Sequence, residues 1–334
     1  MTRALRAEWR RLVARRATRL MVLAMILVSL LVAVTLWFAY RPPSPAEQAQ
    51  INAQYQAALA DFNQHKQVYI NQCLAAQAEQ RKTDPKFDGN CTEAGLRPSK
   101  EEMGWNAPEL QVVWDSILGG IGPTLAGALA LILGATLIGA EYSSRNLSTW
   151  LVFEPRRTRV YLSKLVACAG GGLIVYLVGL VVMLAAAWLV VRVNQGTFDL
   201  SANYWTALFA PKAAWGAGVV AAAGLLAGAI TFVSRRTIIT LAVVVGYFGL
   251  IEAALAHFVT LVRPYTLGNN VLALIRGTRA VQTSSCSGWF TSQFGCQAVT
   301  ATIQRSWAGV GLAGLLLVIG LIGWLFFRRR DIAN

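Results

Sequence analysis

The chain has 334 residues, of which 55% are hydrophobic and 14% charged, and its formal net charge is +14. Soluble globular chains are about 45–50% apolar, so this composition, with a mean hydropathy of +0.48, excludes that class. The basic residues gather at the ends of hydrophobic segments, where they determine topology, so the excess charge does not indicate a nucleic-acid partner.

The first 19 residues combine seven arginines with apolar residues at helical spacing: Leu5, Trp9, Leu12 and Val13. This pattern predicts a basic amphipathic helix over 1–19 that lies on the inner surface of the membrane. The alternative is a topology signal and nothing more. The apolar run 20–40 follows as a first span, because it is too long for a cleavable signal peptide and Arg41-Pro42-Pro43 replaces a small-residue cleavage site.

A polar segment, 41–115, follows the first span. Its apolar residues recur three, four or seven positions apart, and they are Ile51, Tyr55, Leu59, Phe62, Tyr69 and Cys73. We therefore expect a small, mainly helical extracytoplasmic domain with one helix over 46–80 and mostly loop over 81–110. A domain of this size buries little core alone, so it is expected to pack on a partner copy or on the other outer loop.

Five more spans are predicted, each about long enough to cross a bilayer. The second covers 116–140, with a kink at Pro123; the third to fifth lie within 165–262, at 165–192, 213–233 and 237–262; and the sixth lies within 307–334, ahead of a basic tail. Between the last two spans, 263–306 is an outer segment with a short amphipathic helix that starts near Asn269-Asn270. The predicted fold class is an all-α integral membrane protein with six transmembrane helices.

Charge predicts the orientation. The connections 1–19, 145–164, 235–236 and 328–330 hold 17 of the 30 Lys and Arg residues. Much of the remaining positive charge lies in the long segment 41–115, and long translocated segments count little toward orientation. Both termini are therefore predicted to be cytoplasmic.

Four of the five cysteines fall in segments predicted to face an oxidising compartment: Cys73, Cys91, Cys286 and Cys296. Disulfides are expected there, and three pairings are open. The local pairs, Cys73 with Cys91 and Cys286 with Cys296, require the least loop closure. The alternative is free thiols.

Glu252 is the one acidic residue inside a predicted span, and His257 follows five residues later. An unpaired charge at this depth is costly, so Glu252 should face the bundle interior or a cavity, or be protonated. Two interpretations stay open: a polar lining of a substrate path, or a buried hydrogen bond that fixes the fifth helix.

Motifs for catalysis are missing from the sequence. It contains no G-x-x-x-x-G-K-[ST] phosphate cradle, no HExxH and no CxxC. We therefore expect no enzymatic site, no metal and no cofactor in this chain, and any ATP-driven step would need a separate polypeptide.

The connection 141–164 lies between the second and third predicted spans. Leu147, Trp150, Leu151 and Phe153 approach the spacing of one helical face, Pro155 ends that helix, and Arg156, Arg157, Arg159 and Lys164 follow. A short amphipathic helix with a basic exit is typical of a docking element. The connection resembles the first cytoplasmic loop of ABC-2 type transporter permeases, which have a Glu after the second span, a helix, a Pro with Arg-rich residues, and a Lys that opens the third span.

The resemblance covers nearly the whole chain. It implies that 1–19 is a cytosolic connecting helix and that 263–306 is an extracytoplasmic re-entrant or gate segment. It implies the permease subunit of a bacterial ABC exporter in the plasma membrane, paired with a second copy or a homologue and with two cytosolic ATPase subunits that bind ATP and magnesium. The cargo expected from the apolar spans is an amphipathic or hydrophobic compound: a drug, antibiotic, natural product or lipid. The residues expected to couple to the ATPase are Glu141, Arg145, Leu147, Trp150, Leu151, Pro155, Arg156, Arg157 and Arg159. Alternatives are an ion-coupled carrier that uses Glu252, or a membrane scaffold or sensor that presents 41–115.

Overall fold

The structure is a computed structural model that describes residues 2–81, 88–100, 104–144, 146, 152, 156–287 and 295–329. Helices dominate it, as predicted. Six helical stretches in the described residues are long and apolar enough to cross a membrane, and we call them the first to sixth spans: Arg16–Tyr40, Leu110–Ser143, Arg157–Val193, Tyr204–Ser234, Thr237–Phe258 and Arg305–Arg329.

The chain divides into two compact units. One, which we call the bundle, comprises 1–36, 109–190 and 198–334. The other, which we call the α3 unit, comprises 37–108 and 191–197. Each is described by itself.

The α3 unit is built on the long helix α3, Pro45–Arg81, which confirms the helix predicted over 46–80. A short helix, α4 (Glu93–Leu96), lies against α3, and a disulfide joins Cys73 to Cys91. Among the described residues of this unit, Phe62 is the largest buried apolar side chain, at 3% exposed. The indole N–H of Trp105 donates to the Tyr40 carbonyl at 3.1 Å, and the Thr197 N–H donates to the Pro108 carbonyl at 3.0 Å, which closes the unit.

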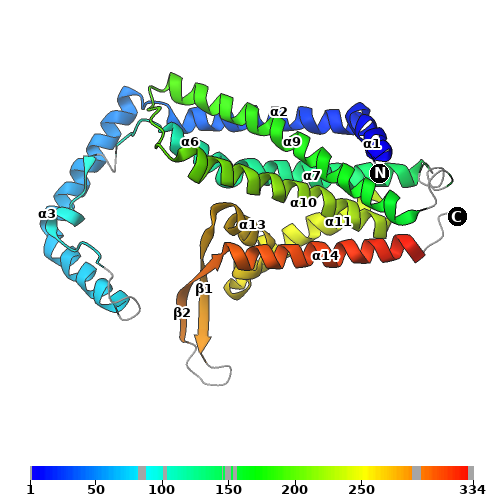
Figure 1. The fold of residues 1–334 in the computed structure, drawn as a ribbon. Helices are drawn as coiled ribbons and strands as arrows, with labels where there is room; N and C mark the ends of the chain where they lie inside the picture. The colour runs from blue at the N-terminus through cyan, green and yellow to red at the C-terminus, as the bar shows by residue number, and fades with distance from the viewer. Residues whose placement is uncertain are drawn as a thin grey trace. The chain divides into compact units, whose positions relative to one another are not determined.

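The bundle begins with α1, Thr2–Ala14, after which the chain turns at Arg15 into α2, Arg16–Tyr40. The second span is α6 (Leu110–Ser116), a π-helical segment and α7 (Gly122–Ser143); the third is α9 (Arg157–Val193). The fourth contains α10 (Ala210–Ser234), the fifth α11 (Thr237–Gly246) and α12 (Ala256–Phe258), and the sixth is α14 (Arg305–Arg329). Helix α10 packs against both α7 and α14 (Figure 1).

Small residues let the central helices approach closely. A Cβ at Gly224 of α10 would lie 2.6 Å from the Cys168 carbonyl of α9, which is too close for any side chain. One turn later, a Cβ at Gly228 would lie 3.0 Å from Cys168 Sγ. The GxxxG pair of the fourth span therefore packs within the bundle, where backbone contact replaces side-chain interdigitation.

Two of the three π-helical segments in the described chain stand just before a proline. Ile117–Ile121 precedes Pro123, and Tyr204–Phe209 precedes Pro211. A proline removes one helical hydrogen bond, and its ring collides with the carbonyl four residues earlier. A wider π turn takes up that misfit. The disturbance predicted at Pro123 thus takes the form of a π turn within a continuous second span.

The all-α prediction is wrong for the segment between the fifth and sixth spans. The fifth span ends at Phe258, earlier than the predicted 262, and a 3₁₀ turn, Thr260–Tyr265, follows. Helix α13, Leu267–Arg276, then leads into an antiparallel hairpin of β1, Thr278–Ser287, and β2, Gly295–Gln304. Helix α13 starts at Leu267 because Thr266 is its extended N-cap residue, so the start predicted at Asn269-Asn270 is two residues late.

Within the bundle, the hairpin and α13 share a core with α10 and α14. The buried residues come from α13, both strands and α14, with partly buried residues of α10 and α14 against them: Ala273, Leu274, Val281, Ile303 and Ala308, with Val219 and Leu312. Burial of these apolar side chains fixes the segment to the ends of two spans. Figure 1 shows α13 beside α14 at the base of the hairpin.

Candidate functional site

Most of the expected coupling residues of the 141–164 connection lie outside the described residues: Arg145, Leu147, Trp150, Leu151 and Pro155. The described ones are Glu141, in the last turn of α7, Arg156, just before α9, and Arg157 and Arg159, in its first turn. The structure therefore defines how the connection is anchored at both ends.

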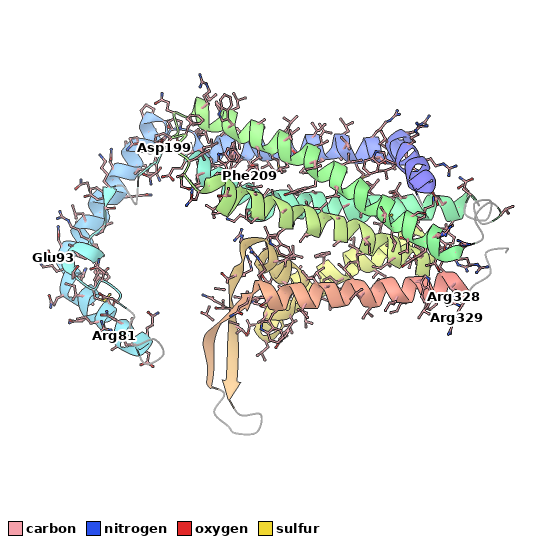
Figure 2. All side chains as sticks on the ribbon, in the orientation of Figure 1. Arg81, Glu93, Asp199, Phe209, Arg328 and Arg329 are labelled. Atoms are coloured by element: carbon pink, nitrogen blue, oxygen red, sulfur yellow. A yellow bond between two sulfur atoms is a disulfide. The ribbon has the colours of Figure 1, made fainter. Side chains whose placement is uncertain are left out.

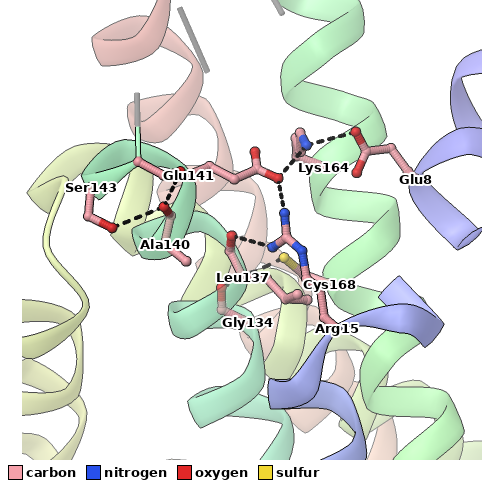
Figure 3. A network of polar contacts seen from close by, with 10 residues as sticks. Glu8, Arg15, Gly134, Leu137, Ala140, Glu141, Ser143, Lys164 and Cys168 are labelled. Atoms are coloured by element: carbon pink, nitrogen blue, oxygen red, sulfur yellow. Dashed lines mark hydrogen bonds and ion pairs between the residues drawn. The ribbon is translucent and has the colours of Figure 1, made fainter. Parts of the chain in front are cut away.

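A buried charge cluster joins these ends to the N-terminal helix (Figure 3). Lys164 Nζ of α9 lies 2.6 Å from Glu141 Oε1 of α7 and 2.7 Å from Glu8 Oε1 of α1. Arg15, at the turn between α1 and α2, forms an ion pair with the same Glu141 oxygen and donates to the Leu137 carbonyl at 2.9 Å. The side chains of Glu141 and Lys164 are 3% exposed, that of Glu8 is 6% exposed and that of Arg15 is 27% exposed.

Within the part of the chain that the structure describes, two carboxylates of the cluster face one ammonium and one guanidinium. Removing ions from water is costly, and the cost is recovered only when each ion has well-placed partners. Glu141 is central to the cluster because its Oε1 atom forms ion pairs with both Lys164 and Arg15. Its other oxygen, Oε2, is buried and has no hydrogen-bond partner among the described residues. A cavity of about 10 Å³ beside the cluster is close to the smallest volume that holds one water molecule.

Packing of α1 brings Glu8 to Lys164. Leu12 is buried, and a Cβ at Gly171 of α9 would lie 3.2 Å from its methyl carbon. The ring of Trp9 lies over Gly170, where a Cβ would approach it to 2.7 Å. Gly170 and Gly171 thus leave room on the surface of α9 for α1 to pack closely. The chain turns at Arg15, and the Arg15 guanidinium contacts Glu141.

The sequence reasoning missed Glu8 and treated Arg15 as one of several topology charges. A signal was present: Glu8 is the single acidic residue among the first 19 and lies one helical turn from Leu12 and Leu5. An acid on the apolar face of a basic helix indicates a buried cationic partner. Glu141 was expected to contact a partner protein, but its side chain points into the cluster within this chain.

The basic exit of the connection contacts the sixth span. Arg157 donates from one Nη to the Arg328 carbonyl at 3.0 Å and to the Phe327 carbonyl at 3.4 Å. The indole N–H of Trp324 donates to Thr158 Oγ1 at 3.2 Å. Arg156 and Arg159 are exposed, as are Arg328 and Arg329 at the end of α14 (Figure 2). The starts of α2 and α9 and the ends of α7 and α14 therefore meet at one end of the bundle.

The two residues expected to line a substrate path have different surroundings. Glu252, half-buried in the π-helical segment Tyr247–Leu255, accepts a hydrogen bond from the Gly268 N–H at 2.8 Å, while Tyr247 Oη accepts one from the Leu267 N–H at 3.1 Å. Both groups cap the first turn of α13, whose N-cap residue Thr266 makes no side-chain cap. A Cβ at Gly268 would lie 2.5 Å from Glu252 Oε2, so a larger residue there would displace the Glu252 carboxylate. His257 is exposed.

The cysteines follow the local pairing where it is described. The Cys73–Cys91 disulfide, with a sequence separation of 18, confirms one predicted pair, and Cys168 is a free, buried cysteine in α9. The backbone register of β1 and β2 places Cys286 directly opposite Cys296. Directly paired strand positions have the Cα spacing that a disulfide needs, so the second bond stays a prediction that the register favours.

Within the described residues, no group of three or more His, Cys, Asp or Glu side chains is arranged to hold a metal ion. Comparison with family models, with curated proteins and with solved structures finds no match to this chain.

Proposed function

We propose that the chain is the membrane-spanning subunit of an ATP-driven exporter of the ABC-2 type. In this proposal it pairs with a second copy or a homologue in a plasma membrane and binds two cytosolic ATPase subunits. The ATPases hydrolyse ATP, and the spans move the cargo.

The buried charge cluster is the observation that carries the proposal. A coupling loop must transmit movement of a cytosolic ATPase to the spans. This requires that both ends of the loop are rigidly attached to the spans. Glu141 and Lys164 stand at those two ends and contact each other, and Glu8 and Arg15 add α1 to the same cluster. Displacement of the connection would therefore move α1, α7 and α9 together, because separating the ions would leave buried charges unpaired.

The cluster changes the role assigned to Glu141. Its carboxylate positions the connection from inside the chain, so direct contact with an ATPase falls to the connection itself and to the exposed Arg156 and Arg159. Arg157 ties the start of α9 to the end of α14. A push on the connection would then reach the sixth span as well as the second and third.

The character of the spans supports the proposed class of cargo. Charges on the described spans lie chiefly toward their ends, as with Glu141, Lys164, Asp115 and Lys212, and Glu252 is occupied with the cap of α13. A pathway among such helices favours an amphipathic or hydrophobic compound over a large sugar polymer. A drug, an antibiotic, a natural product or a lipid fits this description.

The test is co-purification. The tagged chain, extracted from its own cells in mild detergent, should bring an ATPase subunit in a one-to-one ratio. The double variant Arg156→Glu with Arg159→Glu should release it, while leaving the Arg157 contact to α14 intact. Arg236→Glu is the matched control: it is an exposed arginine at the neighbouring connection between α10 and α11, and its reversal should leave the ATPase bound.

A chain that purifies alone under every mild condition would overturn the proposal. Transport that depends on Glu252 and persists without an ATPase would then identify an ion-coupled carrier. A chain with neither transport nor an ATPase partner would be a scaffold or sensor that presents the 41–115 region.

A further inference from the structure

Four arginines without nearby acidic residues in the sequence lie between the end of the fifth span and the first residue of the sixth span. From Ala253 to Arg330 the sequence contains no Asp or Glu, and Arg263, Arg276, Arg279 and Arg305 all fall within this run. None of these four forms an ion pair within the described residues. Their hydrogen-bond acceptors there are backbone carbonyls and one side-chain amide.

Two of the four are used as helix caps. Arg305 donates from Nε to the Leu274 carbonyl at 2.9 Å and from an Nη to the Ile275 carbonyl at 3.2 Å, at the end of α13, and its guanidinium stacks 5.5 Å from the Trp215 ring. Arg263 donates in the same way to the carbonyls of Ala256 and His257, at 2.8 and 3.2 Å. The orphan carbonyls and partial negative charge of a helix C-terminus account for both.

For the other two, Arg276 and Arg279, only the Nε–H of each guanidinium has a hydrogen-bond acceptor among the described residues. Arg276 donates from Nε to the Gly119 carbonyl at 2.8 Å, which is the acceptor left vacant because Pro123 has no N–H. Arg279 donates from Nε to Asn269 Oδ1 at 2.7 Å. The Nη groups of both have no acceptor among the described residues, so the planar edge that recognises an oxyanion is open on each side chain.

The two guanidiniums also act on each other. Partial burial, and then the charge of Arg276, hold the pKa of Arg279 below its ordinary value. Asn269 and Arg276 stand seven residues apart on α13 and hence on one face of it, and Arg279 extends along that face to reach Asn269. Like charges held together without a carboxylate favour a bound anion.

Exposed aromatic residues mark the depth of this pair. Tyr265, two residues after Arg263, is 82% exposed, and Trp307, two residues after Arg305, is 76% exposed. Such side chains concentrate at the level of lipid headgroups. Phosphate oxygens are the anions most abundant at that level.

We propose that Arg276 and Arg279 form a binding site for the phosphate group of an anionic amphiphile. A headgroup phosphate of a membrane lipid and free phosphate present the same oxygens to the two guanidinium edges. The site does not depend on the exporter proposal, since it needs neither an ATPase nor a direction of transport.

Native mass spectrometry of the purified full-length chain tests the site. Dioleoyl phosphatidylglycerol is the probe, and dioleoyl phosphatidylcholine, with the same acyl chains and no net charge, is its matched lipid. Phosphatidylglycerol should bind about tenfold more tightly than phosphatidylcholine, and Arg279→Gln should remove about that tenfold preference, as expected for losing a charge-assisted contact. Glutamine keeps an N–H donor for Asn269, so the local fold is retained.

Arg236→Gln is the charge-matched control at the other end of the bundle and should leave the preference unchanged. Arg276→Gln should act like Arg279→Gln. If it fails to fold because the Gly119 carbonyl loses its donor, Arg279→Gln alone decides. Displacement of the lipid by millimolar inorganic phosphate would assign recognition to the phosphate group alone; arginine-dependent binding that resists phosphate would assign it to the lipid. Equal phosphatidylglycerol binding by the native chain and Arg279→Gln would overturn the site.

Discussion

At the residue scale, Glu141 is the side chain on which the cytosolic end of the proposed exporter depends. It meets Lys164 and Arg15 with one buried oxygen. Among the described residues, Glu141→Gln would remove one of the two carboxylates that contact Lys164 and the carboxylate that contacts Arg15. Removing one partner of a buried ion pair costs about 3–5 kcal/mol. We therefore expect a loss of this order in the free energy of unfolding, seen as a lower thermal midpoint of the chain in detergent.

Two variants separate this effect from a general loss of charge. Lys66→Gln breaks the exposed pair with Glu93 and should lower the thermal midpoint far less than Glu141→Gln does. Lys164→Met combined with Glu141→Gln removes the buried cation along with the anion, so the double variant should lose less than the two single variants together. An additive result would show that Glu141 and Lys164 are not coupled.

At the element scale, the start of α3 has a cap that is sensitive to pH. The Ser44 N–H donates to Glu47 Oε2 at 2.7 Å, and the Glu47 N–H donates to Ser44 Oγ at 3.3 Å, which is a capping box with Pro45 in the first helical position. The hydrogen bond from the Ser44 backbone, followed by that from its hydroxyl and by the charge of Arg41, lowers the pKa of Glu47 below its ordinary value of 4.5.

Because the folded pKa lies below the unfolded one, the cap stabilises the helix above about pH 4.5 and is lost as the pH falls through the folded pKa. A carbon-13 titration of the Glu47 carboxyl should show a midpoint below 4.5 that rises toward that value in Ser44→Ala. An unmoved midpoint in Ser44→Ala would mean that the Ser44 hydroxyl does not hold the carboxylate, because alanine keeps the backbone N–H.

Local elements of this chain could be predicted from sequence, while its tertiary contacts could not. The six apolar runs and the spacing from Ile51 to Cys73 specify helices whatever surrounds them. The hairpin was missed because its strands were read only as a polar outer segment, although Val281 and Ile303 alternate with polar residues and are buried in the shared core. The contact of Glu8 with Lys164 depends on the turn at Arg15 and on the glycines of α9 beneath Trp9 and Leu12, which no local pattern encodes.

At the scale of the whole molecule, an even number of spans returns the chain to the side on which it began. Contacts in the bundle agree with this count of spans, because they place the start of α2 and the ends of α7 and α14 at the same end of the bundle. Arg15 contacts the end of α7, and Arg157 contacts the end of α14. This shared end carries most of the arginines of the short connections. The positive-inside rule therefore predicts that this end lies in the cytosol.

Labelling with a membrane-impermeant maleimide tests this assignment in a background of Cys286→Ser and Cys296→Ser. Ser144→Cys, exposed at the end of α7, should react only after the cells are opened. Gln56→Cys, exposed on α3 beyond the first span, should react in intact cells. Labelling of Ser144→Cys in intact cells would place the 141–164 connection outside. No cytosolic ATPase could then reach the connection, and the charge cluster would not serve to couple an ATPase to the spans.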